Sequence, residues 1–129
     1  MGAAPVFATQ PAEVVLVVED DVSVREAIAD VLADEGFDVV TVNDGRQALD
    51  YLAAHGAPCL ILLDLYMPVM GGEEFRDVQL KDERFAGIPV VVISAAHDGR
   101  QRAARLAAAD YLQKPIALDA LLDVVSTYC

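Results

Sequence analysis

The stretch LILLDLYMPVMGGEEF, residues 60–75, decides the fold of this chain. Its first four residues form a continuous apolar run, as expected for a strand buried on both faces of a parallel sheet. The run stops at Asp64, and a loop follows at 67–72 with one proline and two glycines. A helix is predicted from Glu73 to about Lys81. Its predicted packing positions are Phe75, Val78 and Leu80.

The same alternation of strand and helix runs through the rest of the chain. Further strands are predicted at 14–18, 37–42, 90–93 and 111–112. Further helices are predicted at 24–32, 44–55, 97–109 and 118–125, with Asp21 or Ser23 as the first N-cap, and Gly36 and Gly56 as stops. Five strands alternating with five helices predict an α/β fold. We expect a doubly wound, flavodoxin-like (βα)5 sheet of five parallel strands with helices on both faces.

The length of 129 residues suits one domain, expected at 13–129 behind a flexible N-terminal lead-in at 1–12. The net charge of −12 argues against direct nucleic-acid binding. The apolar runs are too short to span a bilayer, and no leader peptide opens the chain, so we expect a cytoplasmic location and no membrane contact. Cys59 and Cys129 show no metal-ligand spacing. We expect Cys59 as a buried hydrophobe and Cys129 as a free thiol, in a reducing compartment.

Polar side chains stand where the predicted strands end. Glu19 and Asp20 follow the first strand, Asp64 the third, Ser94 the fourth and Lys114 the fifth. In sheets of this kind ligands bind beyond the carboxyl ends of the strands, where the strand order reverses. We therefore expect these five side chains to converge at one edge of the sheet.

Clustered carboxylates repel one another unless a cation lies among them. Oxygen ligands at a phosphoryl site suit Mg²⁺, or Mn²⁺, with Asp20 and Asp64 as direct ligands and Glu19 acting through water. A carboxylate beside a metal can attack phosphorus and form an acyl phosphate. Lys114 would supply positive charge to the phosphoryl oxygens, and the Ser94 hydroxyl one hydrogen bond.

These residues lie in four short motifs: VVED at 17–20, LLDLYMP at 62–68, ISAA at 93–96 and YLQKP at 111–115. In sequence and order they resemble the motifs of response-regulator receiver domains of two-component signalling, of the chemotaxis-regulator-like kind. The spacings also fit, with 44 residues from Asp20 to Asp64, 30 from Asp64 to Ser94 and 50 from Asp64 to Lys114. The resemblance covers about residues 13–128.

The resemblance implies a role for each residue. Asp64 is the expected phosphoacceptor and Lys114 the phosphate-binding lysine, while the backbone carbonyl of Tyr66 is the third protein ligand of the metal. Ser94 is the expected switch hydroxyl, and Tyr111 the aromatic ring that changes rotamer with it. A cis peptide is expected between Lys114 and Pro115. Such a domain is not an enzyme acting on external substrates, since it catalyses only its own phosphorylation and dephosphorylation.

The implied partners are a histidine kinase or a histidine phosphotransfer protein as donor, and a downstream protein or a fused output domain as receiver of the signal. Bulky Tyr66 and small Ala96 flank the site, and shielding by Tyr66 predicts slow autodephosphorylation. Arg100, Arg102 and Arg105 form a basic cluster, which is interpreted either as a solvated helix face or as a partner contact.

Three departures from the family pattern concern the loop and the fourth helix. Gly71 stands where the family often has Asp, which loosens the loop after Met70. The segment from Ser94 to Lys114 is about two residues short. Ala107 stands where a glycine usually ends the fourth helix, which predicts a helix that is short, shifted or poorly ordered.

Two other functions are compatible with parts of the pattern. One is a phosphorylation-independent, receiver-like interaction module in which the acidic site is a relic. The other is a phosphatase of the haloacid dehalogenase type with an aspartyl nucleophile. Such enzymes usually carry a second Asp two residues after the nucleophile, and here that position is Tyr66.

Overall fold

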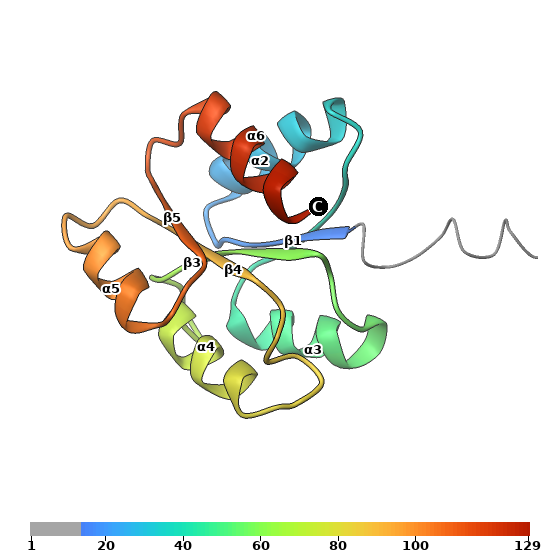
Figure 1. Ribbon diagram of the computed structural model, residues 1–129, viewed down its shortest axis with the longest axis vertical. Helices are drawn as coiled ribbons and strands as arrows, with labels where there is room; N and C mark the ends of the chain where they lie inside the picture. The colour runs from blue at the N-terminus through green and yellow to red at the C-terminus, as the bar shows by residue number, and fades with distance from the viewer. Residues whose placement is uncertain (1–13) are drawn as a thin grey trace, which may run out of the picture.

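The computed structural model of the chain describes residues 14–129, so the predicted lead-in at 1–12 lies outside the described residues. Figure 1 shows a sheet between two layers of helices. The strands are β1 (Val14–Val18), β2 (Asp38–Val42), β3 (Leu60–Asp64), β4 (Val90–Ser94) and β5 (Asp110–Gln113). The helices are α2 (Val22–Asp34), α3 (Gly45–His55), α4 (Gly72–Leu80), α5 (Gly99–Arg105) and α6 (Leu118–Tyr128).

The strands of the described region form one parallel sheet in the order β2-β1-β3-β4-β5. Strand β2 lies on one side of β1, and the next strand, β3, lies on the other side of β1. The order therefore reverses between β1 and β3, where their carboxyl ends carry Glu19 and Asp64. The predicted doubly wound α/β fold is confirmed.

Alternate residues of the strands face opposite sides of the sheet, so two separate apolar layers form. One layer joins strand residues such as Val17, Leu62 and Ile93 to α2 and α6. The opposite layer joins residues such as Leu16 and Leu63 to helices that include α3 and α4. Figure 1 shows α2 and α6 on one side of the sheet and α3, α4 and α5 on the other.

Several predicted helix boundaries are confirmed by their local chemistry. Asp21 caps α2 by accepting a hydrogen bond from the Val24 backbone N–H, and Asp44 caps α3 in the same way from Gln47. The helix after Asp44 ends at Gly56, whose φ of +88° is readily adopted by glycine. The Lys114–Pro115 peptide is cis, as the resemblance implied.

The predicted packing face of α4 is partly wrong. Phe75 is fully buried, but Val78 is 38% exposed and Leu80 46% exposed. Arg76 and Gln79 are buried instead, because Arg76 donates hydrogen bonds to the Leu106 and Ala107 carbonyls and to Gln79 Oε1. Hydrogen bonds to the end of α5 make it possible to bury these polar side chains.

The helix predicted at 97–109 is short, as the departure at Ala107 suggested. It spans seven residues, Gly99–Arg105, and Ala107 adopts the left-handed conformation with φ of +55°. An L-residue with a Cβ atom pays a steric penalty in this conformation. Arg76 holds the Leu106 and Ala107 carbonyls at this turn, which compensates for the missing glycine.

The predictions of Cys59 as an unpaired buried hydrophobe and Cys129 as a free thiol are wrong, because the two cysteines form a disulfide. Helix α6 runs back along the sheet and ends beside the residue that leads into β3. The Cα atoms of Cys59 and Cys129 lie 5.5 Å apart, within the range that a disulfide can bridge. The cysteines therefore no longer support a reducing compartment.

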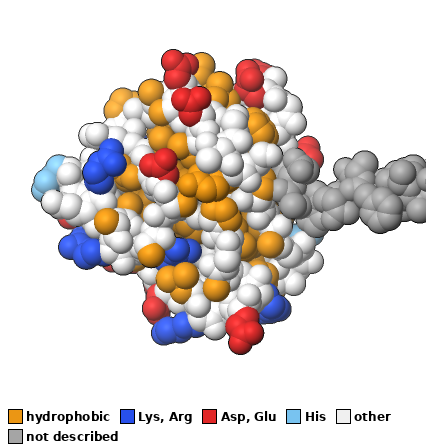
Figure 2. Space-filling model, viewed as in Figure 1, with side chains coloured by type: hydrophobic (Ala, Val, Ile, Leu, Met, Phe, Trp, Pro, Cys, Tyr) orange, Lys and Arg blue, Asp and Glu red, His pale blue; other side chains and the backbone are white. Residues whose placement is uncertain are grey.

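The surface mixes apolar, acidic and basic side chains. On the face in Figure 2 acidic side chains lie among the basic ones, so this face presents no continuous basic surface of the kind that binds nucleic acid. Within residues 14–129, no helix combines the length and the apolar character needed to cross a membrane.

Candidate functional site

Three carboxylates meet at the carboxyl edge of the sheet. Glu19 and Asp20 directly follow β1, and Asp64 is the last residue of the neighbouring β3. One oxygen from each lies within 4.8 Å of the others. Glu19 and Asp64 are buried, whereas Asp20 is exposed. Three anionic oxygens this close repel one another, so the arrangement fits a hard divalent cation that retains water ligands.

Lys114 lies across the same cluster. Its Nζ is 2.6 Å from Glu19 Oε1 and 3.5 Å from Asp64 Oδ2. Burial by itself would lower the pKa of Lys114, but the Glu19 and Asp64 carboxylates outweigh this effect and raise it above its usual value. Lys114 therefore carries a positive charge at the carboxylate of Asp64.

Glu19 is the most enclosed of the three acids. Burial raises the pKa of its carboxyl above the usual value, although the ion pair with Lys114 and the Asp21 N–H act in the opposite direction. The buried Oε1 receives no hydrogen bond of regular geometry, and its contact with Lys114 is an ion pair. At 2.6 Å the Lys114 ammonium balances the charge of this oxygen, so the Glu19–Lys114 ion pair lies beside the position where the three carboxylates could hold a metal ion.

Ser94 ends β4, the strand beside β3, and is fully buried. Its Oγ accepts a hydrogen bond from the Ala96 N–H at 3.1 Å. Its backbone carbonyl accepts from the Lys114 N–H at 2.9 Å and from the Tyr111 hydroxyl at 3.3 Å. Ser94 thus contacts both Tyr111, the other residue predicted for the switch, and Lys114, the lysine predicted to bind phosphate.

Tyr111 is held against the start of α5. A Cβ atom at Gly99 would lie 2.5 Å from the Tyr111 hydroxyl, so only glycine leaves room for the ring in this position. The Arg100 guanidinium carbon lies 5.2 Å from the ring centre. The partly buried ring therefore packs against the start of α5 while its hydroxyl contacts the end of β4.

The loop after β3 wraps closely around Asp64. The Tyr66 N–H lies 3.4 Å from Asp64 Oδ1, at the long end of hydrogen-bond distances. A Cβ at Gly72 would overlap the Asp64 carbonyl oxygen, so this glycine allows the close approach. Val69 has φ of +68°, a rare conformation for a β-branched residue, and is 81% exposed.

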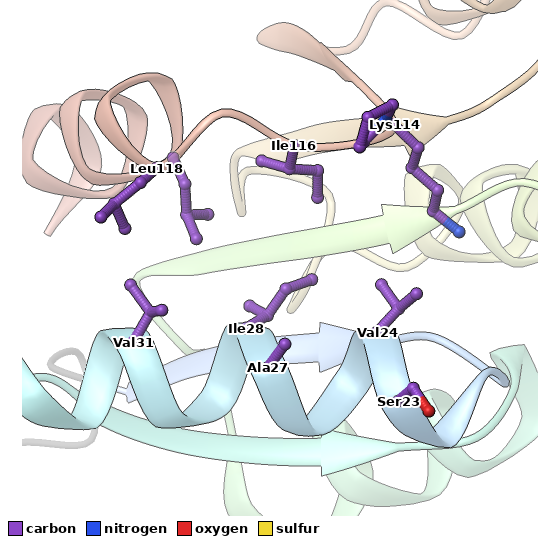
Figure 3. Close-up of a pocket in the computed structure, with 10 residues that line it drawn as sticks. Ser23, Val24, Ala27, Ile28, Val31, Lys114, Ile116 and Leu118 are labelled. Carbon is purple, nitrogen blue, oxygen red and sulfur yellow. The ribbon is translucent and has the colours of Figure 1, made fainter.

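An apolar groove of about 410 Å³ leads away from Lys114. Val24, Ile28 and Val31 of α2 form one wall, and Ile116 and Leu118 face them across the groove (Figure 3). In the same view the Lys114 amino group points toward the end of a strand, in agreement with its contact with Asp64.

The ion pairs of Arg102 are not among the contacts predicted from the sequence. We interpreted the basic cluster as a solvated face or a partner contact, but Arg102 forms ion pairs with Glu73 at 2.8 Å and Asp98 at 3.1 Å. The spacing of four residues between Asp98 and Arg102 on a helix was a usable signal for the second pair. The first pair joins α4 to α5 and is visible only in the fold.

Comparison with known proteins identifies the family. The family model described as "Response regulator receiver domain" matches residues 15–126. The chain belongs to this family. It is 40% identical over 116 residues to the response regulator protein FleR of Pseudomonas aeruginosa, covering 88% of this chain and 24% of that protein. It is 38% identical over 112 residues to the response regulator MprA of Mycolicibacterium vanbaalenii, covering 84% of this chain and 46% of that protein.

A solved structure of a response regulator has a similar fold. The chemotaxis response regulator CheY4 of Vibrio cholerae matches with a TM-score of 0.79 and 29% identity, over 90% of this chain and 98% of that chain. The chain is thus a receiver domain of two-component signalling, in which the family serves as phosphoacceptor. It spans less than half the length of the curated relatives FleR and MprA.

Proposed function

We propose that this receiver takes a phosphoryl group from a phosphohistidine onto Asp64 and that Lys114 and a divalent metal ion assist the transfer. The observation that supports this most directly is the position of Asp64 between Lys114, 3.5 Å away, and the carboxylates of Glu19 and Asp20. Asp64 Oδ would attack phosphorus as the bond to the histidine nitrogen breaks, and the acyl phosphate would remain on the domain. It would thus catalyse only its own phosphorylation and dephosphorylation.

The proposed metal is Mg²⁺ or Mn²⁺. Asp20 and Asp64 would bind it directly, Glu19 through water, and the Tyr66 backbone carbonyl would complete the protein ligands. The metal would neutralise negative charge on the transferring group. Lys114 neutralises the same charge from the protein side, and its point charge suits a phosphoryl oxygen.

The signal would leave the site through Ser94 and Tyr111. Ser94 Oγ is engaged with the Ala96 N–H, and turning toward the phosphoryl group would require it to give up that bond. The Tyr111 hydroxyl binds the Ser94 carbonyl, so movement of this strand end would release the ring as well. We propose that phosphorylation thereby changes the β4–α5–β5 face and its affinity for a downstream protein or fused output domain.

The decisive experiment is labelling with a small phosphodonor such as acetyl phosphate in the presence of Mg²⁺. We expect one acid-labile phosphoryl group on the wild-type chain and none on Asp64→Asn, with labelling strongly reduced in Asp20→Asn. Equal labelling of wild type and Asp64→Asn would overturn the assignment. Labelling that leaves partner binding unchanged would favour the phosphorylation-independent interaction module.

The donor is proposed to be a histidine kinase or a histidine phosphotransfer protein that docks along the groove between α2 and the start of α6. The groove is apolar and ends at Lys114, and Leu118 on its rim is 53% exposed. A donor seated there would bring its phosphohistidine to Asp64. Because such donors receive their phosphoryl group from ATP, we also propose a cytoplasmic location, where the Cys59–Cys129 disulfide would be exposed to reduction.

Leu118→Glu tests the docking site. We expect this variant to label normally with acetyl phosphate but to lose most phosphotransfer from the donor protein, because only the protein donor needs the groove. Leu80→Glu changes a leucine on α4 that is 46% exposed, against 53% for Leu118, and serves as the matched control that should retain both reactions. Equal phosphotransfer to all three chains would refute the docking proposal.

A further inference from the structure

Arg102 contacts three separate segments around the site. Its Nη1 lies 2.8 Å from Glu73 Oε2 at the start of α4, and its Nε lies 3.1 Å from Asp98 Oδ2 just ahead of α5. Its guanidinium carbon is 5.1 Å from the centre of the Tyr66 ring. A planar guanidinium can bind two carboxylates along its edge while its face lies against an aromatic ring.

The two carboxylates restrict the position of the guanidinium. The Arg102 side chain is 29% exposed, although it belongs to a short surface helix. The Asp98 contact comes from the helix's own N-cap residue, whereas Glu73 belongs to another helix. Arg102 therefore has a defined orientation toward Tyr66 that a freely moving surface arginine would lack.

Tyr66 connects Arg102 to the reacting carboxylate. Its backbone N–H lies 3.4 Å from Asp64 Oδ1, and its side chain is 52% exposed. At this exposure the ring is only partly packed, and the Arg102 guanidinium is one contact that restrains it. The order of the residues in space is Asp64, Tyr66 and then Arg102.

We propose that Arg102 is a positioning residue for this site: by holding the Tyr66 ring and its loop in place, it tightens Mg²⁺ binding and slows hydrolysis of the acyl phosphate. The hydrolysis part rests on the proposed function of Asp64. In that reaction a water oxygen bonds to phosphorus while the bond from phosphorus to the Asp64 oxygen breaks. The products are inorganic phosphate, the restored carboxylate and a proton. A restrained Tyr66 ring hinders the approach of this water.

The test compares Arg102→Gln with Arg105→Gln, which removes the same charge from an exposed position one turn further along α5. Mg²⁺ affinity is measured by amide NMR titration, which needs no phosphorylation. The decay of acetyl-phosphate-labelled protein gives the hydrolysis rate. We expect Arg102→Gln to weaken Mg²⁺ binding and to speed decay by about three- to fivefold each, the scale of one cation–π contact. Arg105→Gln should leave both unchanged.

Two further variants separate positioning from a general structural effect. In a Tyr66→Ala background, which itself should decay faster, Arg102→Gln should add nothing. Arg102→Lys should restore part of the Mg²⁺ affinity, because it keeps the charge but lacks the planar fork. Equal Mg²⁺ affinities for Arg102→Gln and Arg105→Gln would overturn the proposal, as would additive effects with Tyr66→Ala. Failure of wild type to label would count against Asp64 as acceptor, while the Mg²⁺ titration would still decide the role of Arg102.

Discussion

Reduction of the Cys59–Cys129 disulfide is expected to destabilise this receiver strongly. The two cysteines are 70 residues apart in sequence, so the bond closes a loop over more than half of the chain. Reopening a loop of this length returns about 15 cal/mol/K of entropy to the unfolded chain, or about 4.4 kcal/mol at 25 °C in the chain-entropy account. With about 2.1 cal/mol/K of unfolding entropy per residue, the expected fall in Tm is roughly 16 °C.

The assay is thermal unfolding followed by circular dichroism, with and without a thiol reductant. The Cys59→Ser, Cys129→Ser double variant is the control: it should unfold near the temperature of the reduced wild type and should not respond to reductant. Alkylation of both thiols in the folded, unreduced protein would show that the pairing is wrong. A reduced protein whose Tm stays within about 2 °C of the oxidised one would refute the entropy argument.

Three other perturbations test backbone and charge. Ala107→Gly should raise the free energy of unfolding in urea by about 0.5–1 kcal/mol, because glycine adopts the left-handed conformation without a Cβ clash. The control Ala104→Gly, within α5, should lower it by about 1 kcal/mol. Equal effects of the two substitutions would contradict the backbone argument. Val69→Asn should stabilise the domain by about 1 kcal/mol, because asparagine adopts a positive φ more readily than a β-branched residue. The same urea-unfolding curves measure this change. A loss of stability would show that the loop tolerates valine without strain. Burial raises the pKa of Glu19, so the metal-free fold binds this proton more tightly than the unfolded chain does. The stability that protonated Glu19 contributes is present below its usual pKa of 4.5 and is lost as pH rises through its raised pKa in the fold. Glu19→Gln should remove that part of the dependence of unfolding free energy on pH. Identical profiles for wild type and Glu19→Gln would contradict this prediction.

Much of the site could be predicted because the strands are signalled locally. Each buried strand is a short apolar run, and a polar residue at the end of each run must lie at the same edge of a parallel sheet. This rule predicts that Glu19, Asp20 and Asp64 meet, and in the fold one oxygen of each lies within 4.8 Å of the others. The contact of Lys114 with Asp64 follows from the same rule.

The packing face of α4 could not be predicted in the same way. Phe75 with Val78 defines one apolar stripe, and Phe75 with Arg76 and Gln79 defines the face that the helix actually buries. Burial of an arginine is favourable only where hydrogen-bond acceptors surround its guanidinium. For Arg76 these acceptors are the carbonyls of Leu106 and Ala107 after α5, 30 and 31 residues away in the sequence. Helical periodicity contains no information about acceptors on another element.

The sequence by itself determined the order of strands and helices, the edge of the sheet that carries the carboxylates, and the family resemblance, because each depends on residue type at short or regular spacing. Only the tertiary structure decided that Cys59 meets Cys129 and that Arg102 joins α4 to Tyr66. Such contacts depend on how two elements far apart in the chain come to lie side by side. Their geometry arises from packing the whole core, and no local pattern records it.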